Sequence, residues 1–153
     1  FTGDRSGDWL YRALFEHGFA NQPNSTSRED GLELIRACIT AVVHCAPPDN
    51  KPNGGEIQNC ESFLNQSFEL TKPRVVLCLG GIAWKESFKL FKKKKWWSEK
   101  SIPKFGHQVS YQLENKVWVF GSYHPSQQNT FTKRLTKEMF DQVFREIQGR
   151  LYS

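Results

Sequence analysis

Two continuous apolar stretches alternate along the chain with amphipathic ones, and this order predicts the architecture. Residues 37–44 (ACITAVVH) and 74–80 (RVVLCLG) are rich in β-branched side chains and apolar on both faces. Both are therefore predicted to be strands of a sheet that is covered on its two sides. Each ends at a break: the proline-rich and glycine-rich segment APPDNKPNGG follows the first, and Gly80-Gly81 follows the second.

Apolar residues at helical spacing occupy the segments around these strands. Helices are predicted over residues 8–17, 56–70, from 81 onward, and 135–151. Residues 109–113 and 117–120 flank a polar turn and predict a hairpin or a pair of short strands, while residues 19–31 and 121–129 are predicted to be loops. Alternating strands and helices indicate an α/β fold with a mostly parallel sheet.

Composition narrows the class of protein. The 153 residues are enough for one domain with a real core, so residues 1–153 are taken as one domain. The net charge of +5 favours a polyanionic partner such as nucleic acid. No apolar run reaches the roughly 20 residues that span a bilayer, and no signal peptide opens the chain. We therefore expect a soluble, intracellular (cytoplasmic) protein without a membrane partner.

An intracellular protein does not usually build a disulfide framework, so its four cysteines need another explanation. Cys45 follows the first predicted strand and Cys60 lies on the next helix, with fourteen residues between them. Two thiolates alone cannot define a zinc or cluster site. Cys38 and Cys78 lie inside apolar strands and are predicted to be core residues.

Residues 122–135 (SYHPSQQNTFTKRL) leave the last predicted strand with a histidine and several polar side chains. Open α/β sheets hold ligands at the carboxyl ends of their strands, which favours a binding loop around His124. The alternative is a polar surface loop with an incidental histidine. Residues 89–100 (KLFKKKKWWSEK) could contact DNA phosphates, but a solvated helix end is the preferred interpretation because cations complement the helix dipole.

Four collinear segments resemble one enzyme family. GSYHPSQQNTFTKRLT resembles the third motif of the family 5 uracil-DNA glycosylases, the iron-sulfur branch, and FTGDRSGDWLYRAL, ITAVVHCAPPDNKP and LCLGGIAW match it in order and approximate spacing. The resemblance implies the uracil-DNA glycosylase fold, with a short central sheet and helices on both faces. It also implies base excision repair: a monofunctional enzyme flips uracil and other deaminated bases out of DNA and hydrolyses the glycosidic bond, leaving an abasic site.

The resemblance assigns roles to individual residues. His124 is expected to stabilise the departing base by a hydrogen bond, and Phe1 to stack on the extruded uracil. Gly3 is expected to let the backbone approach the base closely. Asp4 is a weaker candidate, since an acid there more often caps the following helix. The residues expected to hold the DNA backbone are Ser126, Gln127, Asn129 and Arg134.

The resemblance also implies a cofactor. Cys45 and Cys60 correspond to half of a four-cysteine set that holds a 4Fe-4S cluster, and we expect the other pair upstream. Because the chain opens directly on Phe1, we expect it to lack the N-terminal part of the enzyme.

The sequence departs from the related families at two positions. They carry Asn at the position of Ala41 (family 4) or often at that of Val43 (family 5). A site without that amide loses one reason to reject bases other than uracil, in keeping with a range of deaminated substrates.

Two other functions compete with this interpretation. A non-catalytic DNA-binding iron-sulfur module, or an inactive fragment of the enzyme, would share the same charge and cysteines. A generic nucleotide-binding α/β protein would need a GxGxxG or P-loop fingerprint, which the sequence lacks. We expect the protein to act on DNA as a monomer.

Overall fold

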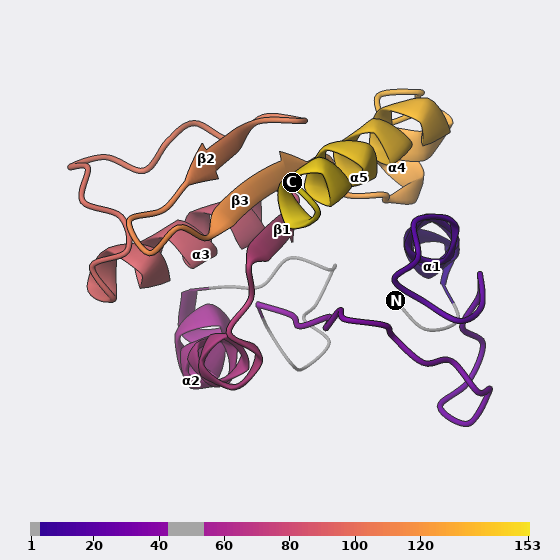
Figure 1. Cartoon of the computed structure of the whole chain (residues 1–153), viewed down its shortest axis with the longest axis horizontal. Helices are drawn as coiled ribbons and strands as arrows, with labels where there is room; N and C mark the ends of the chain where they lie inside the picture. The colour runs from indigo at the N-terminus through magenta and orange to yellow at the C-terminus, as the bar shows by residue number, and fades with distance from the viewer. Residues whose placement is uncertain (1–3, 43–53) are drawn as a thin grey trace.

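The computed structural model describes residues 4–42 and 54–153, with the side chains of 54–60 left out. Its elements are α1 (Arg5–Glu16), α2 (Gly54–Thr71), β1 (Val75–Leu79), α3 (Gly81–Lys93), β2 (Ser110–Gln112), β3 (Trp118–Ser122), α4 (Gln127–Phe131) and α5 (Lys137–Leu151) (Figure 1). The predicted strand at 74–80, the hairpin and the four helices are thus confirmed to within a few residues.

The three strands form one small mixed sheet in the order β1-β3-β2. β1 pairs with β3 in parallel, with Cys78 opposite Gly121, and β2 pairs with β3 antiparallel across the predicted hairpin. The α/β class is confirmed. The described sheet has one parallel pairing, between β1 and β3, and one antiparallel pairing, between the hairpin strands β2 and β3.

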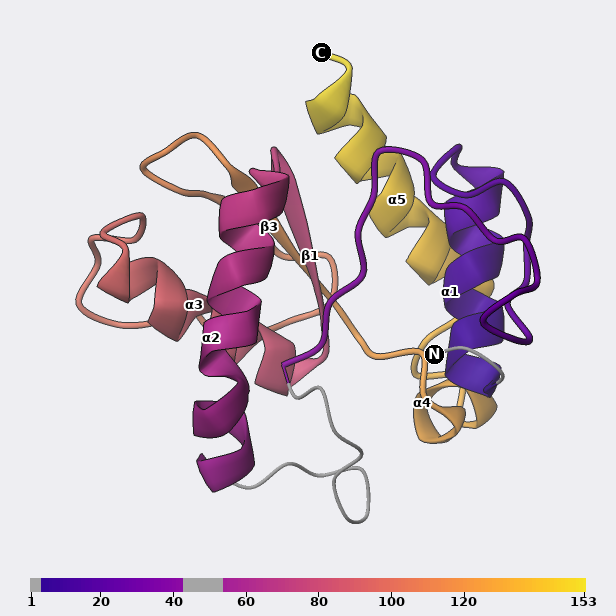
Figure 2. The same ribbon diagram turned by 90° about the horizontal axis from the view of Figure 1, so that it is seen from below.

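Helices cover both faces of this sheet, as predicted. Successive residues of a strand point to opposite faces, and β3 follows this rule. Phe120 is buried in a core cluster with residues of α1 and α5, whereas Val119 is buried in a second cluster with residues of α2 and α3. Figure 2 shows the resulting layers, with α2 and α3 on one side of β1 and β3 and α5 and α1 on the other.

The prediction of a strand at 37–44 is wrong for its described residues, 37–42, which form no strand. Side-chain contacts fix this segment instead. The Thr40 hydroxyl lies 3.1 Å from that of Ser67 on α2, and Ala37 and Ile39 pack against the first core cluster. Cys38 lies between these two residues but is exposed, so its assignment to the core is also wrong. Residues 43 and 44 lie outside the described residues.

Capping side chains set the helix ends. Asp4 accepts a hydrogen bond from the Gly7 amide at 2.5 Å, so α1 begins three residues before the predicted start. Thr136 caps α5 in the same way, through the Met139 amide at 3.2 Å, and leaves Leu135 outside the helix.

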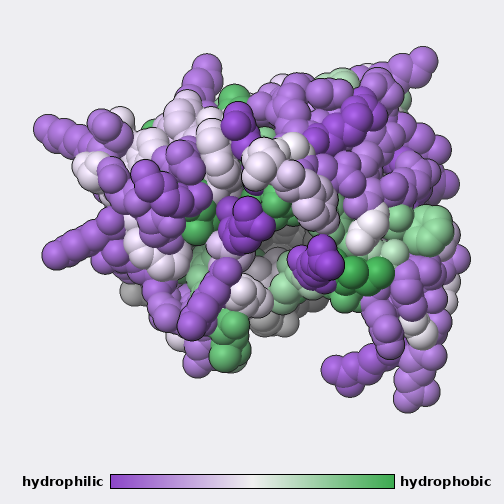
Figure 3. Space-filling model, in the orientation of Figure 1, coloured by the Kyte–Doolittle hydropathy of each residue, from purple (hydrophilic) through white to green (hydrophobic). Residues whose placement is uncertain are grey.

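None of the helices in the described part is long and apolar enough to cross a membrane. The face shown in Figure 3 is largely hydrophilic, with apolar residues in small, scattered patches.

Candidate functional site

The predicted binding loop leaves the sheet at the carboxyl ends of two parallel strands. β1 ends at Leu79, and the amide of the next residue, Gly80, donates to the Ser122 carbonyl at 2.8 Å. β3 ends at Ser122, two residues before His124. Gly80 adopts φ +97°, and a Cβ on it would lie 3.5 Å from the Cβ of His124. The turn that begins α3 therefore lies directly beside His124, at the edge where open α/β sheets bind ligands.

Hydrogen bonds hold the backbone of His124 in place. The His124 carbonyl accepts from the Ser126 amide at 2.7 Å and from Nδ2 of Asn129 at 2.9 Å. The Ser126 hydroxyl caps α4 by accepting from the Asn129 amide at 3.3 Å. Ser126 and Asn129 are thus brought together with His124, and in this structure both shape its loop. Gln127 is exposed on the first turn of α4.

The environment of His124 favours its neutral form. The side chain is half-buried, and burial lowers its pKa below the usual range, opposed by the negative charge of Asp4. A neutral imidazole still carries one N–H, so His124 can donate a hydrogen bond at neutral pH. The start of α1 lies near this loop, since the guanidinium of Arg5 lies 5.0 Å from the centre of the Phe131 ring, although the two are far apart in the sequence.

Cations and aromatic rings surround the loop. The guanidinium of Arg134 lies 4.7 Å from the centre of the Tyr123 ring, and that of Arg5 lies 5.0 Å from the centre of the Phe131 ring. Phe131 is 63% exposed. Arg134 is exposed too, so this surface offers both positive charge and an aromatic face to a polyanion.

Two residues beside the loop had no predicted role. One is Gly80. The Gly-Gly pair directly after a buried strand could have predicted a turn at the edge of the sheet where ligands bind. The other is His107, which contacts the backbone of Tyr123, the residue before His124. Its partners are distant in the sequence, so no local pattern could have indicated it.

The other predicted site residues cannot be placed. Phe1, Gly3 and Cys45 lie outside the described residues, and Cys60 lies on α2 with its side chain left out. In the described part of the chain, no three His, Cys, Asp or Glu side chains gather as metal ligands. Burial raises the pKa of the Cys78 thiol to about 12, so it stays protonated and is a poor ligand. This burial confirms the prediction that Cys78 is a core residue.

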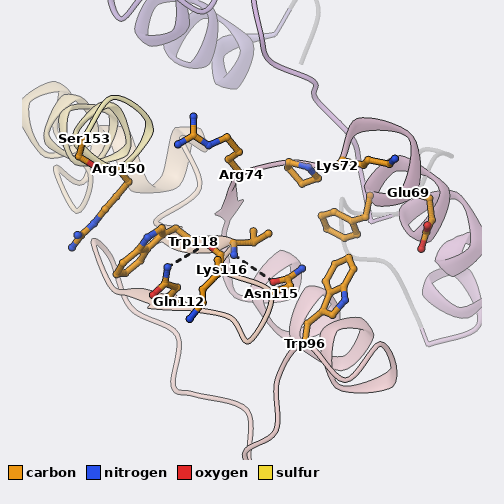
Figure 4. Close-up of a pocket in the computed structure, with 13 residues that line it drawn as sticks. Glu69, Lys72, Arg74, Trp96, Gln112, Asn115, Lys116, Trp118, Arg150 and Ser153 are labelled. Atoms are coloured by element: carbon orange, nitrogen blue, oxygen red, sulfur yellow. Dashed lines mark hydrogen bonds between the residues drawn. The ribbon is translucent and has the colours of Figure 1, made fainter.

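A hollow of about 680 Å³ lies at the other end of the sheet, where β1 and β3 begin (Figure 4). Its lining includes Lys72, Arg74, Lys116 and Arg150. These four side chains are all exposed and point in different directions, so they do not converge on one ligand (Figure 4). Because the hollow lies at the opposite end of the sheet from His124, it is separate from the candidate site.

The lysine-rich run at the end of α3 fits the solvated interpretation. Lys93 pairs with Glu61 at 2.5 Å, and Lys94 pairs with Glu69. Trp96 and Trp97 are partly buried against the second core cluster, and the ammonium of Lys94 lies 4.9 Å from the centre of the Trp96 ring.

Comparisons with known proteins assign the class. Residues 1–148 match the uracil DNA glycosylase superfamily, and the chain therefore belongs to it. Within that superfamily it resembles the type-5 enzymes. It is 46% identical over 148 residues to the type-5 uracil-DNA glycosylase of Mycobacterium bovis and 40% identical over 147 residues to that of Thermus thermophilus, with 95% of the chain covered in each case. A type-4 uracil-DNA glycosylase of Archaeoglobus fulgidus is 33% identical over 100 residues, which cover 63% of this chain and 48% of that enzyme.

The chain spans only part of these relatives. The match covers 54% of the Mycobacterium bovis protein and 64% of the Thermus thermophilus protein. The resemblance to the type-5 family is thus confirmed over nearly the whole chain, while a large share of each relative lies outside the match.

Proposed function

We propose that the full-length protein is a DNA glycosylase that extrudes uracil and hydrolyses its glycosidic bond. The observation that carries the proposal is the half-buried His124, held at the carboxyl ends of β1 and β3 by backbone hydrogen bonds and favoured in its neutral form. The superfamily match over residues 1–148 spans this loop and the adjoining turn at Gly80.

The chemistry follows from where charge develops. When the bond between base and sugar stretches, the sugar becomes oxocarbenium-like and the base gains negative charge on its carbonyl oxygens. An N–H of His124 that donates to such an oxygen stabilises the transition state more than the ground state. Water then adds its hydroxyl to the anomeric carbon and its proton to the base, giving a free base and an abasic site. The resemblance implies a monofunctional enzyme without a Schiff base on lysine, so the strand would stay uncut.

DNA would bind across the loop. Gln127 and Arg134 are exposed and suited to phosphate contacts, while Ser126 and Asn129 act by shaping the loop that meets the backbone. Phe1 would stack on the extruded base, with Gly3 allowing close approach. The substrates would include other deaminated bases as well as uracil. The protein would act as a monomer inside the cell.

A 4Fe-4S cluster belongs to the same proposal. Cys45 and Cys60 would supply two thiolate ligands, and the other two would come from a part of the full-length protein outside this chain. The choice of Cys45 and Cys60 rests on the family resemblance. The buried Cys78 is a poor alternative, because burial raises the pKa of its thiol to about 12. The cluster would stabilise the fold rather than contact the base.

The direct test is excision by the full-length protein. A labelled duplex with one uracil is incubated with it, treated with alkali to break abasic sites, and resolved on a denaturing gel. The proposal predicts cleavage at the uracil only after alkali. Cleavage before alkali would indicate strand scission by the enzyme. Binding of the duplex without any alkali-sensitive product would instead support the non-catalytic DNA-binding module.

A further inference from the structure

His107 lies behind the loop that carries His124 and joins it to α5. Its Nδ1 accepts a hydrogen bond from the Tyr123 amide at 3.2 Å, and its Nε2 lies 3.2 Å from the Met139 carbonyl in the first turn of α5. A backbone N–H can only donate, so Nδ1 must be unprotonated. The proton of the neutral ring is therefore on Nε2, which donates to Met139.

The turn that carries His107 is fixed to the sheet. The Gln108 amide donates to the Gly121 carbonyl at 2.8 Å, and the Gly121 amide donates to the Val109 carbonyl at 2.9 Å. Backbone approaches backbone so closely here that a Cβ on Gly121 would lie 2.8 Å from the Gly106 carbonyl oxygen. The side chain of Gln108 also donates to Glu146 on α5 at 2.6 Å. His107 thus connects the end of β3 to α5 through its two ring nitrogens.

We propose that His107 is a positioning residue for His124, a role that rests on the proposed glycosylase function. The Tyr123 amide is held by His107 from one side, and the His124 carbonyl is held by Ser126 and Asn129 from the other. Together these bonds restrain the backbone on both sides of the Tyr123–His124 peptide. They set the direction in which the His124 side chain leaves the main chain.

Burial favours the neutral form of His107 that these two hydrogen bonds require. Burial lowers its pKa, and the Met139 carbonyl and the charge of Glu146 oppose that shift. On the loop side, the guanidinium of Arg134 lies over the Tyr123 ring, 4.7 Å from its centre. The His107 ring itself lies 5.0 Å from the Tyr123 ring, centre to centre, so the side chain of Tyr123 is confined as well as its amide.

Two conservative variants separate the two bonds of His107. Asn places an oxygen near the position of Nδ1 and can still accept from the Tyr123 amide, whereas Gln places its amide near Nε2 and can still donate to Met139. The matched control is His17→Ala, because His17 is also half-buried and bonded to α5, through Gln148 and Asp141. That control removes a comparable histidine without touching the loop.

The experiment measures single-turnover excision of uracil and duplex affinity for the full-length variants. His107→Ala should lower the excision rate constant by about 10-fold to 10²-fold, because a small misplacement of a catalytic group is costly, with affinity nearly unchanged. His107→Asn should recover most of the rate, and His107→Gln should not. His17→Ala should excise at the wild-type rate. If the alanine variant fails to fold, the comparison of Asn with Gln decides.

Imidazole ¹⁵N spectra provide a readout that does not depend on activity. The proposal predicts that His107 of the wild-type protein carries its proton on Nε2 and that the Tyr123 amide is protected from exchange, with protection lost in His107→Ala. Wild-type excision by His107→Ala, or equal rescue by Asn and Gln, overturns the positioning role. A wild-type protein that does not excise uracil overturns the proposed function itself, and the spectra then still decide whether His107 fixes the Tyr123 amide.

Discussion

Substitution of Gly121 by Ala tests the close approach that fixes the His107 turn to β3. The new Cβ would lie 2.8 Å from the Gly106 carbonyl oxygen, 3.2 Å from Cγ2 of Val109 and 3.3 Å from Cε2 of Phe105, whereas ordinary contact begins near 3.4 Å. The nearest of these atoms belongs to the backbone and cannot rotate away. Overpacking of a buried site costs about 1 to 3 kcal/mol, and we expect about 2 kcal/mol here.

The assay is denaturant or thermal unfolding of the full-length variant. A loss of about 2 kcal/mol corresponds to a fall in melting temperature of roughly 4 to 8 °C for a domain of this size. The matched control is Gly149→Ala in α5, where a new Cβ would meet nothing within 4 Å. Because Ala restricts the unfolded chain and favours the helix, this control should gain about 0.5 kcal/mol. A Gly121→Ala protein as stable as the wild type would refute the packing described here.

Three further predictions concern pH, salt and metal. Burial lowers the pKa of both half-buried histidines of the site, so the unfolded chain takes up protons first, and the free energy of unfolding should fall as pH drops below about 6.5. Equilibrium unfolding at pH 7.5 to 5.5 checks this, and His107→Asn should flatten the slope. Arg134→Ala should weaken binding to all duplexes alike and reduce the slope of log affinity against log salt by about 0.9, whereas Lys116→Ala, at the opposite end of the sheet, should change neither. An unchanged slope in Arg134→Ala would remove it from the phosphate contacts. Full-length protein purified without oxygen should be brown, and Cys45→Ala or Cys60→Ala should lose the absorbance near 400 nm, roughly where thiolate-to-iron charge transfer absorbs. If Cys78→Ala loses this absorbance as completely as the other two variants, the cluster ligands are wrongly assigned.

The parts of the fold that follow from local pattern were predictable. The apolar run at residues 74–80 and the apolar residues of 117–120 form β1 and β3, since such runs are buried wherever a sheet forms. The position of His124 just beyond a strand was enough to place it at the ligand-binding edge of the sheet. Helix boundaries were less accurate because the caps at Asp4 and Thr136 lie outside the apolar stripes.

The parts that depend on distant partners were not predictable from local pattern. Residues 37–42 have the composition of a buried strand, but a strand also needs a neighbour to share its hydrogen bonds, and composition does not specify one. In the structure, Thr40 lies beside Ser67 on α2 instead. The role of His107 depends on contacts to residues 16 and 32 positions away in the sequence, which no periodicity records.

The central claim is that His124 stabilises the departing base, and single-turnover excision by His124→Ala tests it most directly. The rate constant should fall by about 10² to 10³, the usual cost of one transition-state donor, while duplex affinity barely changes. Asn in place of His124 should restore part of the rate, because its amide can also donate. A His124→Ala protein that excises uracil at the wild-type rate would contradict the account and leave this loop with DNA binding alone.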